Sequence, residues 1–490
     1  MKQYILAIDQ GTTSTRAIIF DKNADLISQA QIELNQYYPK SGWVEHDPEE
    51  IWNSTIQCCK NAMHSANLSS SDILAIGITN QRETTLIWDK ETGTTIYPAI
   101  VWQDRRTADY CKEFNEYESI IFKKTGLLLD AYFSVSKIAW LLNHIPNVRE
   151  KAENGKLAFG TIETFLLWRL TKGKVHATDI TNASRTSLMN IETGLWDQEL
   201  LNLFDIPESI LPSIYPNCAE FGTTDVLGEN IPILGMAGDQ QAALIGQTCF
   251  KQGMLKSTYG TGAFLLLNTG DTIVRSQHRL LTTIAYQINQ NICYGLEGSI
   301  FIAGAAIKWL CNELKIINTP EESEMAASNL HDNGGVYFIP AFSGLGAPYW
   351  QPEARGAIFG LSHSSHHQYI TRAALEAVCY QTKNLIELMH HDCDFTINNC
   401  RVDGGMVQNN WFLQFLTDIL SIDIVCPEIT ETTALGAAFL AGLQAGLFTS
   451  LEELPHYLQS SKKFTPQMSK LLREEYYQKW LFYVEKLMPQ

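Results

Sequence analysis

The sequence has few basic residues, and this scarcity limits the partners that we expect. It contains 36 lysine and arginine residues against 53 aspartate and glutamate residues, a formal net charge of −17 at pH 7. Unspecific binding to nucleic acid or to an anionic membrane needs a basic surface, so we expect neither. A small anionic ligand is still allowed, because it needs only a local patch of hydrogen-bond donors.

The chain also lacks long apolar runs, paired cysteines and histidine clusters. No stretch approaches the roughly 20 apolar residues that span a membrane, and the first residues enter a strand-like run without a separate targeting segment. The eleven cysteines are scattered without a Cys-x-x-Cys pair, and no His or His/Cys cluster has zinc-type spacing. We therefore expect a cytoplasmic protein that uses cysteine as a small apolar residue.

The length and the alternation of patterns predict the fold class. At 490 residues, with 45% hydrophobic and 18% charged residues, the chain is globular and too long for one core. Strand-like and helix-like runs alternate almost throughout, which is typical of an α/β fold. No low-complexity linker separates the halves, so we expect two packed lobes, residues 1–250 and 251–490.

Two hairpins rich in glycine and threonine lie half a chain apart. The first joins residues 4–8 to residues 16–20, and the second joins residues 253–259 to residues 263–267. β-rich runs around a Gly/Thr turn predict hairpins. Their recurrence indicates a duplicated unit, and therefore two related lobes that face one cleft.

Three further segments have clear local signals. Asp47 is placed to cap a helix that begins at Pro48. A glycine turn, Gly404-Gly405, precedes a helix expected from Asn409 onward. Residues 433–442 form a predicted helix of small residues that suits close packing against a neighbour.

The first hairpin has the groups that phosphate binding needs, namely open backbone N–H groups, hydroxyls and a positive charge. They come from Gly11, Thr12, Thr13, Ser14 and Arg16. Asp9, at the end of the strand, is placed to hold Mg²⁺ through water. The alternative is an ordinary hairpin whose glycine and threonines serve only the turn. The second turn, residues 260–262, favours phosphate binding, because a triphosphate between two lobes needs a hairpin from each.

Arg82 and Glu83 follow the apolar residues 74–78 at the end of a predicted strand. A guanidinium beside a carboxylate can bind vicinal hydroxyls, donating to one and accepting from the other. The alternative is a surface ion pair, worth about 0–1 kcal/mol. Trp102 fits either a core or the wall of a pocket.

Asp239 follows the apolar residues 233–237 and opens a predicted helix. As an N-cap it would have a purely structural role. As a general base it would remove the proton from an attacking hydroxyl. Its position in the sequence is compatible with both roles.

With these segments collected, the chain resembles the FGGY carbohydrate kinases over essentially its whole length, and among them the members that phosphorylate glycerol. The matching stretches are residues 9–14, 77–85, 132–134 with Lys137 and Trp140, 237–241, 259–262, 340–350 and 401–405. Each alone is moderately specific, whereas seven in order are highly specific. Arg82-Glu83 with Trp102 and Tyr132 separates the glycerol-type members from the sugar kinases of the family.

The resemblance implies two actin-like (ribonuclease H-like) lobes, each a mixed five-stranded sheet flanked by helices, that close over ATP, Mg²⁺ and glycerol. The implied reaction is phosphorylation of glycerol to sn-glycerol 3-phosphate with release of ADP, in glycerol uptake and catabolism, and Asp239 is the implied base. The implied glycerol contacts are Arg82, Glu83, Trp102, Tyr132, Asp239, Gln240 and Phe264. The implied nucleotide contacts are Thr12, Thr13, Ser14, Arg16, Thr261, Gly304, Gly405 and Asn409. We also expect a homo-oligomer, a dimer or tetramer.

Two segments depart from the family pattern. Lys308 stands where many members have glutamine, and a cation there would change the contact near the nucleotide, so we leave it out of the predicted site. Several bacterial members bind the inhibitor fructose 1,6-bisphosphate in a glycine-rich loop containing an arginine. Here the corresponding residues 221–230 are shortened, contain no Lys or Arg, and include Asp225 and Glu229. Because carboxylates repel a sugar bisphosphate, we expect insensitivity to it.

Three other functions remain open from the sequence. A kinase for another polyol or ketose would keep the same fold and base. An actin-like ATPase, in which hydrolysis drives lobe closure onto a protein partner, would not need a hydroxyl-activating base opposite the phosphate hairpins. A catalytically inactive sugar sensor would be expected to lose Asp239 or Asp9, and both are present.

Overall fold

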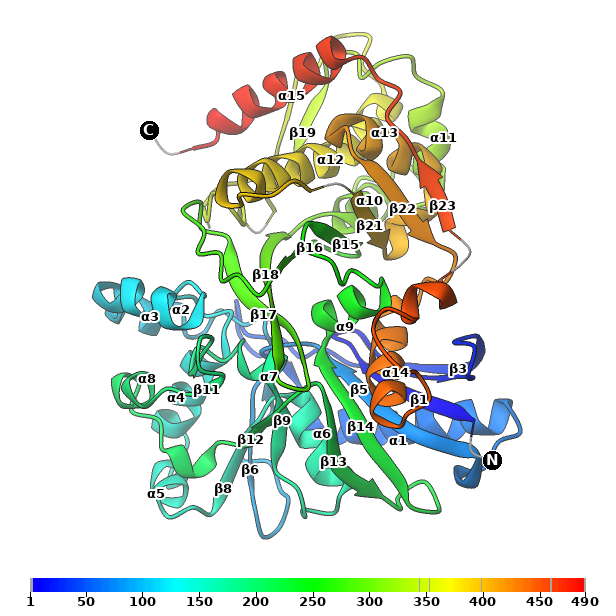
Figure 1. Ribbon diagram of the computed structural model, residues 1–490. Coiled ribbons are helices and arrows are strands. Elements are labelled where there is room, and N and C mark those ends of the chain that lie inside the picture. The colour runs from blue at the N-terminus through cyan, green and yellow to red at the C-terminus, as the bar shows by residue number, and fades with distance from the viewer. Residues whose placement is uncertain (1–2, 343, 352, 398, 459–460, 489–490) are drawn as a thin grey trace.

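The computed structural model describes residues 3–342, 344–351, 353–397, 399–458 and 461–488; Ser343, inside one of the matching stretches, lies outside them. Two large β-sheets, one from each half of the sequence, form the two lobes seen one above the other in Figure 1. No helix in these ranges is both long and apolar enough to cross a membrane.

The N-terminal sheet has six strands within the described residues, in the order β13-β14-β5-β1-β2-β3. They are β1 (Tyr4–Gln10), β2 (Ser14–Phe20), β3 (Leu26–Glu33), β5 (Ile73–Asn80), β13 (Cys218–Thr224) and β14 (Ile231–Gly238). β2 is antiparallel to both β1 and β3, whereas β5 and β14 run parallel to β1. The central residues of β1 are fully buried, as both faces of the sheet are covered.

The C-terminal sheet has seven strands within the described residues, in the order β17-β18-β16-β15-β21-β22-β23. They are β15 (Met254–Tyr259), β16 (Ala263–Gly270), β17 (Leu281–Ile288), β18 (Asn291–Ile300), β21 (Asn399–Asp403), β22 (Asp423–Pro427) and β23 (Ser461–Phe464). β16 is antiparallel to β15 and β18, and β21 and β22 run parallel to β15.

The two sheets share one pattern of five strands, β3-β2-β1-β5-β14 in one lobe and β18-β16-β15-β21-β22 in the other. This repeat is what the two hairpins of the sequence predict. The expected count of five strands per sheet is wrong, however. β13 extends the N-terminal sheet, and β17 and β23 extend the C-terminal sheet by antiparallel pairing at its two edges.

Both predicted hairpins are confirmed. In the first, β1 pairs with β2 so that Asp9 lies opposite Arg16, and the N–H of Gly11 donates to the carbonyl of Ser14 at 2.9 Å. In the second, β15 pairs with β16, and the N–H of Gly260 donates to the carbonyl of Gly262 at 2.9 Å. Each sheet therefore has its tight turn at the same end of its central strand.

The helices that matter for the site are α1 (Pro48–Ser65), α7 (Ile180–Ala183), α9 (Asp239–Gly246), α10 (Gly304–Asn312), α13 (Asn410–Leu420) and α14 (Thr432–Gln444). The others include α2 (Ala108–Glu113), α3 (Glu118–Thr125), α4 (Ser134–His144), α5 (Val148–Glu153), α6 (Ile162–Leu170), α8 (Gln198–Leu203), α11 (Glu322–Ser328), α12 (His367–Asp392) and α15 (Lys470–Glu485). The predicted start of α1 is confirmed, because Asp47 accepts the N–H of Glu49 at 2.8 Å.

The small-residue helix α14 packs as the sequence predicts, but on the other lobe. Figure 1 shows it beside β1 and β5, although it comes from the second half of the chain. A Cβ added at Gly77 of β5 would lie 2.1 Å from the carbonyl oxygen of Ala437, and one at Gly436 would lie 1.8 Å from that of Ala242 in α9. Only glycine permits these approaches, so the two halves of the sequence interlock tightly.

Candidate functional site

An aromatic wall lies beside the first hairpin. The ring centroid of Trp102 is 5.6 Å from that of Tyr132 and 6.1 Å from that of Phe264, both edge-on. Trp102 is only partly buried, and its Nε1 donates to the Thr12 hydroxyl at 2.9 Å. Phe264 is on β16 of the other lobe, so this wall spans both lobes. The arrangement favours a pocket wall over a core position for Trp102.

Arg82 and Glu83 are not a surface ion pair, which rules out that alternative. Their exposed fractions are 3% and 1%. The guanidinium of Arg82 bonds to Asp239, with Nε 3.1 Å from Oδ1, and to the two carboxylate oxygens of Glu297 at 2.5 and 3.2 Å. The carboxylate of Glu83 accepts from Nε of Arg185 at 2.7 Å. Each member of the pair therefore has its own buried partner.

Arg185 and Glu297 complete a buried cluster that the sequence does not reveal. Nη2 of Arg185 donates to Oε1 of Glu297 at 2.8 Å, and both side chains are almost fully buried. Burial raises the pKa of Glu83, an effect that Arg185 and Arg82 oppose. Burial would also raise the pKa of Glu297, but Arg185 and Arg82 hold it below its ordinary value. The two residues lie about a hundred or more positions from Arg82, without any shared motif.

Asp239 is the first residue of α9, and its N-cap is Gly238, so the N-cap interpretation of Asp239 is wrong. Its Oδ1 accepts the N–H of Gln240 at 2.6 Å and lies 3.1 Å from Nε of Arg82. The side chain is 31% exposed, unlike the buried cluster that it contacts. A carboxylate at the edge of the buried cluster, fixed through one oxygen and accessible to solvent, can accept a proton from a bound hydroxyl.

Gln240 is oriented by Lys256, a third residue that sequence reasoning missed. Lys256 is fully buried on β15, and its Nζ donates to Oε1 of Gln240. Burial lowers the pKa of Lys256, while Asp403 and Asp239 oppose that change. With the amide oxygen held by an ammonium group, the NH₂ group of Gln240 is left as its donor. A lysine inside a largely buried strand was the only available signal.

At the first hairpin the charged residues are paired across the lobes. Nη1 of Arg16 lies 2.6 Å from Oε2 of Glu431, which precedes α14. Burial raises the pKa of Asp9 to about 7; Arg16 opposes this rise, and the carboxylates of Glu431 and Asp239 add to it. Asp9 therefore lies near other carboxylates, and a bound cation would neutralise part of this negative charge. In this structure Arg16 is bonded to Glu431 through Nη1 and to Gln31 through Nε.

The chemistry of Asp9 and Asp239 fits Mg²⁺. This ion keeps several waters and is held by one or two carboxylates together with substrate phosphates. No group of three or more His, Cys, Asp or Glu side chains among the described residues is arranged to hold a metal by itself. A magnesium ion here would therefore depend on the nucleotide for much of its coordination.

The predicted nucleotide residues of the C-terminal lobe form a surface built mainly of backbone. The carbonyl of Thr261 accepts the N–H of Ala305 at 3.0 Å, and a Cβ at Gly304 would lie 2.6 Å from the carbonyl oxygen of Gly260. The turn of the second hairpin thus packs against the first turn of α10. The side chain of Thr261 is exposed.

Gly404 and Gly405 follow β21 next to the same hairpin. Gly404 has φ 94°, and a Cβ there would lie 2.5 Å from the carbonyl oxygen of Tyr259. Gly405 is exposed, and a Cβ there would meet nothing within 4 Å. Asn409 caps α13 by accepting the N–H of Phe412 at 2.8 Å, which confirms the predicted start of that helix. Lys308 is exposed on α10.

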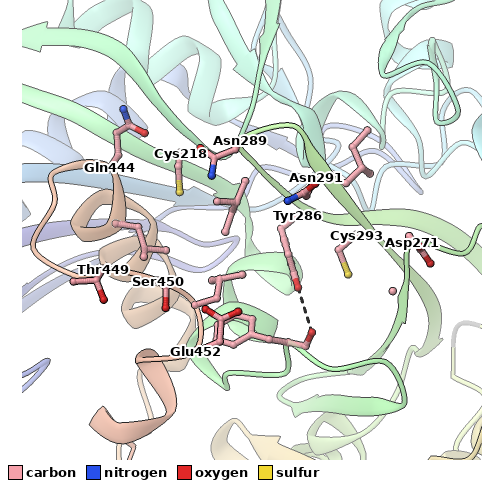
Figure 2. Close-up of a pocket in the computed structure, with 16 residues that line it drawn as sticks. Cys218, Asp271, Tyr286, Asn289, Asn291, Cys293, Gln444, Thr449, Ser450 and Glu452 are labelled. Carbon is pink, nitrogen blue, oxygen red and sulfur yellow. Dashed lines mark hydrogen bonds between the residues drawn. The ribbon is translucent and has the colours of Figure 1, made fainter.

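A separate cavity of about 460 Å³ lies away from all of these residues, between the ends of β13, β16, β17 and α14. Figure 2 shows Cys218, Tyr286, Cys293, Asp271 and Glu452 among the residues that line it. The described residues that line it include two acids and no lysine or arginine, which does not suit a phosphorylated ligand.

Comparison with known proteins gives matches along the whole chain. The N-terminal domain model of the FGGY family of carbohydrate kinases matches residues 4–246, and the C-terminal domain model matches residues 255–445. Glycerol kinase of Coxiella burnetii is 56% identical over 493 residues, covering 100% of this chain and 98% of that protein.

Among solved structures, Plasmodium falciparum glycerol kinase with ADP has a TM-score of 0.92 and 39% identity, covering 99% of this chain and 98% of that chain. A ligand-bound xylulose kinase from Lactobacillus acidophilus has a TM-score of 0.88 at 22% identity, covering 99% and 97%. At that identity the second likeness concerns the fold alone.

Proposed function

The chain belongs to the FGGY family of carbohydrate kinases, and we propose that it transfers the γ-phosphoryl group of ATP to glycerol, forming sn-glycerol 3-phosphate and ADP. The observation that carries this proposal is the position of Asp239, a partly exposed carboxylate held 3.1 Å from the buried Arg82 beside an aromatic wall. The 56% identity to a glycerol kinase over the whole chain supports glycerol as the acceptor.

Glycerol would be bound by the side chains around Asp239, between the buried charged cluster and the aromatic wall. Arg82 donates to one hydroxyl and Glu83 accepts from another, while the rings of Trp102, Tyr132 and Phe264 pack against the carbon chain. The oxygen of the terminal glycerol hydroxyl attacks the γ-phosphorus while Asp239 accepts the hydroxyl proton. The bond between the γ-phosphorus and the β–γ bridging oxygen breaks, and ADP leaves. Holding the glycerol hydroxyl in line with the bond that breaks increases the rate of transfer by orienting the reacting groups.

The triphosphate would lie between the two hairpins. Thr12, Thr13 and Ser14 offer hydroxyls and N–H groups from one lobe, and Thr261, Gly304 and Gly405 offer open backbone from the other. Asp9, with Asp239, would hold a hydrated Mg²⁺ that neutralises charge on the phosphoryl oxygens. Arg16, whose Nη1 is paired with Glu431, would add positive charge beside the first hairpin.

The cellular setting is a further part of the proposal. Nine of the eleven cysteines are buried, and all are free of disulfides. This supports a reducing compartment, and we propose the cytoplasm. The division into N- and C-terminal lobes near residue 250 and the dimer or tetramer remain predictions, which limited proteolysis and analytical ultracentrifugation test respectively.

One assay separates the alternatives. ADP release is followed with glycerol, dihydroxyacetone, xylulose or no acceptor, with Asp239→Asn as the control for background hydrolysis. Glycerol should give the highest kcat/KM and sn-glycerol 3-phosphate as product. A preference for xylulose would indicate a ketose kinase, which the shared fold permits. Equal ADP release without acceptor would indicate the ATPase instead, an alternative that the identity to glycerol kinases does not favour.

A further inference from the structure

Two arginines at the proposed glycerol site, Arg82 and Arg185, are bonded to the same carboxylate from the opposite lobe. Glu297 is on β18 of the C-terminal sheet, whereas Arg82 and Arg185 both belong to the N-terminal half. Its carboxylate binds Arg82 at 2.5 and 3.2 Å and Arg185 at 2.8 Å. It is the shared partner of both guanidinium groups.

These bonds fix the orientation of Arg82 and Glu83, two of the side chains that would contact glycerol. With Nη1 and Nη2 of Arg82 directed at Glu297, the planar guanidinium turns its Nε edge toward Asp239. Arg185 uses Nη2 for Glu297 and Nε for Glu83. Glu297 therefore orients Arg82 directly and Glu83 through Arg185, because an arginine fork is rigid and binds in a fixed plane.

The strand that carries Glu297 also belongs to the nucleotide half of the cleft. In the register of the sheet, Glu297 pairs with Leu266, and Ser299 pairs with Phe264. β16, which contains Phe264, begins directly after the turn of Thr261. A movement of the C-terminal sheet would thus carry Glu297, Phe264 of the aromatic wall and the phosphate hairpin together.

We infer that Glu297 is a positioning residue through which the C-terminal lobe orients the glycerol-binding side chains of the N-terminal lobe. This inference rests on the proposed function, since it assigns the oriented groups to glycerol. It implies that glycerol binds well only when the C-terminal sheet is in place over the N-terminal lobe. A purely structural role would instead be limited to neutralising two buried arginines.

Two variants distinguish these roles. Glu297→Gln keeps the size but loses the charge, and Arg185→Lys keeps the charge but loses the fork. Hydrogen bonds between charged groups correspond to about a ten- to hundredfold change in affinity, so we expect the KM for glycerol to rise by that factor. The KM for ATP should change less than about twofold, because the groups proposed to bind nucleotide are not altered. Glu428→Gln, at an exposed glutamate of the same lobe, is the matched control.

A second measurement is the rise in melting temperature that glycerol causes without nucleotide. It should be large in the unaltered protein and in the control, and small in both variants. The inference is overturned if both variants keep the KM for glycerol within about twofold of the control, or if the KM values for glycerol and ATP rise equally. If Glu297→Gln does not fold, Arg185→Lys decides by the same criteria. Absence of glycerol-dependent ADP release from the unaltered protein would instead refute the proposed function.

Discussion

The strand beside the central hairpin ends differently in the two lobes. β5 lies parallel to β1, and β21 lies parallel to β15, so the two strands are equivalent in the repeated pattern. After β5 the chain places the buried charges of Arg82 and Glu83. After β21 it places Gly404 and Gly405, the second of them exposed. One lobe uses charged side chains at this position, and the other uses bare backbone.

The difference follows from the chemistry of the two proposed ligands. Glycerol is small and neutral, so recognising it requires side chains that reach its hydroxyls and fix their direction. A triphosphate has many acceptor oxygens, which backbone N–H groups at turns and helix starts bind when no side chain obstructs them. If each lobe binds its proposed ligand, the repeated scaffold has two kinds of binding surface, and changes in each lobe should affect different measurements.

The largest effect should come from Asp239, the proposed base of the N-terminal lobe. Asp239→Asn retains the shape, and we expect kcat to fall by roughly 10²–10⁴-fold with the KM for ATP little changed. Steady-state kinetics with a coupled assay measures both. The melting temperature should stay near that of the unaltered protein, since Gly238, rather than Asp239, caps the helix. Near-normal turnover would remove Asp239 from the mechanism.

The N-terminal lobe contains a buried polar network, next to the strand that leads to Arg82, that should make this lobe sensitive to pH. Glu163 accepts the Thr161 and Thr178 hydroxyls at 2.6 and 2.7 Å, and its other oxygen accepts Nδ2 of Asn80 at 2.8 Å. Burial raises the pKa of Glu163 to about 7, and the neighbouring Asp179 adds to this rise. Asn80 ends the strand that leads to Arg82, so the network supports the segment that contains Arg82 and Glu83.

Because the folded pKa of Glu163 is above its unfolded value, the folded state binds the proton more tightly. The free energy of unfolding should therefore fall as pH rises from about 4.5 to about 7, and level off above. At about 1.4 kcal/mol per pKa unit, the contribution of Glu163 to the free energy of unfolding is at most about 3 kcal/mol. Urea unfolding of the unaltered protein and of Glu163→Gln, across pH 5 to 8, measures this contribution. A variant with an unchanged pH profile would show that Glu163 does not titrate in this window.

In the nucleotide lobe, two adjacent glycines give a matched test of the role of backbone. Gly404→Ala should destabilise the protein by about 1–3 kcal/mol, because its φ of 94° and its contact with the Tyr259 carbonyl oppose a side chain. Gly405→Ala should fold normally, since a Cβ there meets nothing within 4 Å. We expect its KM for ATP to rise about three- to tenfold while the KM for glycerol stays constant. Equal effects of Gly405→Ala on both substrates would contradict the division between the lobes.

The sequence was informative where function depends on short segments. Both hairpins, the helix starts after Asp47 and at Asn410, and the small-residue helix were predictable because turn chemistry, caps and residue size act locally. Glu297, Arg185 and Lys256 were not, because their roles arise from contacts between distant strands. The placement of α14 on the N-terminal sheet has the same cause. Pattern predicts that a glycine or alanine face packs closely, but it does not name the partner.

The smallest expected effect is that of fructose 1,6-bisphosphate, which should not inhibit. The turn between β13 and β14 has Asp225 and Glu229, and it packs on Ser70, whose hydroxyl accepts the N–H of Glu229 at 2.9 Å. The structure adds positive charge that the sequence did not place there: the charge of Lys174 acts on Asp225, and Nζ of Lys172 lies 2.5 Å from its Oδ1. Lys172 is already paired, so it does not offer an open site for a phosphate group.

A sugar bisphosphate has several negative charges, and its recognition relies on guanidinium forks or clustered N–H groups. Titrating it into the glycerol-dependent assay should therefore leave the rate unchanged. Asp225→Asn offers a sharper test, since it releases Lys172 and removes one repelling charge. If the variant acquires weak inhibition while the unaltered protein shows none, charge at this turn is the cause of insensitivity. Saturable inhibition of the unaltered protein would show that the ligand binds despite these acids, and that the charge argument for this turn is wrong.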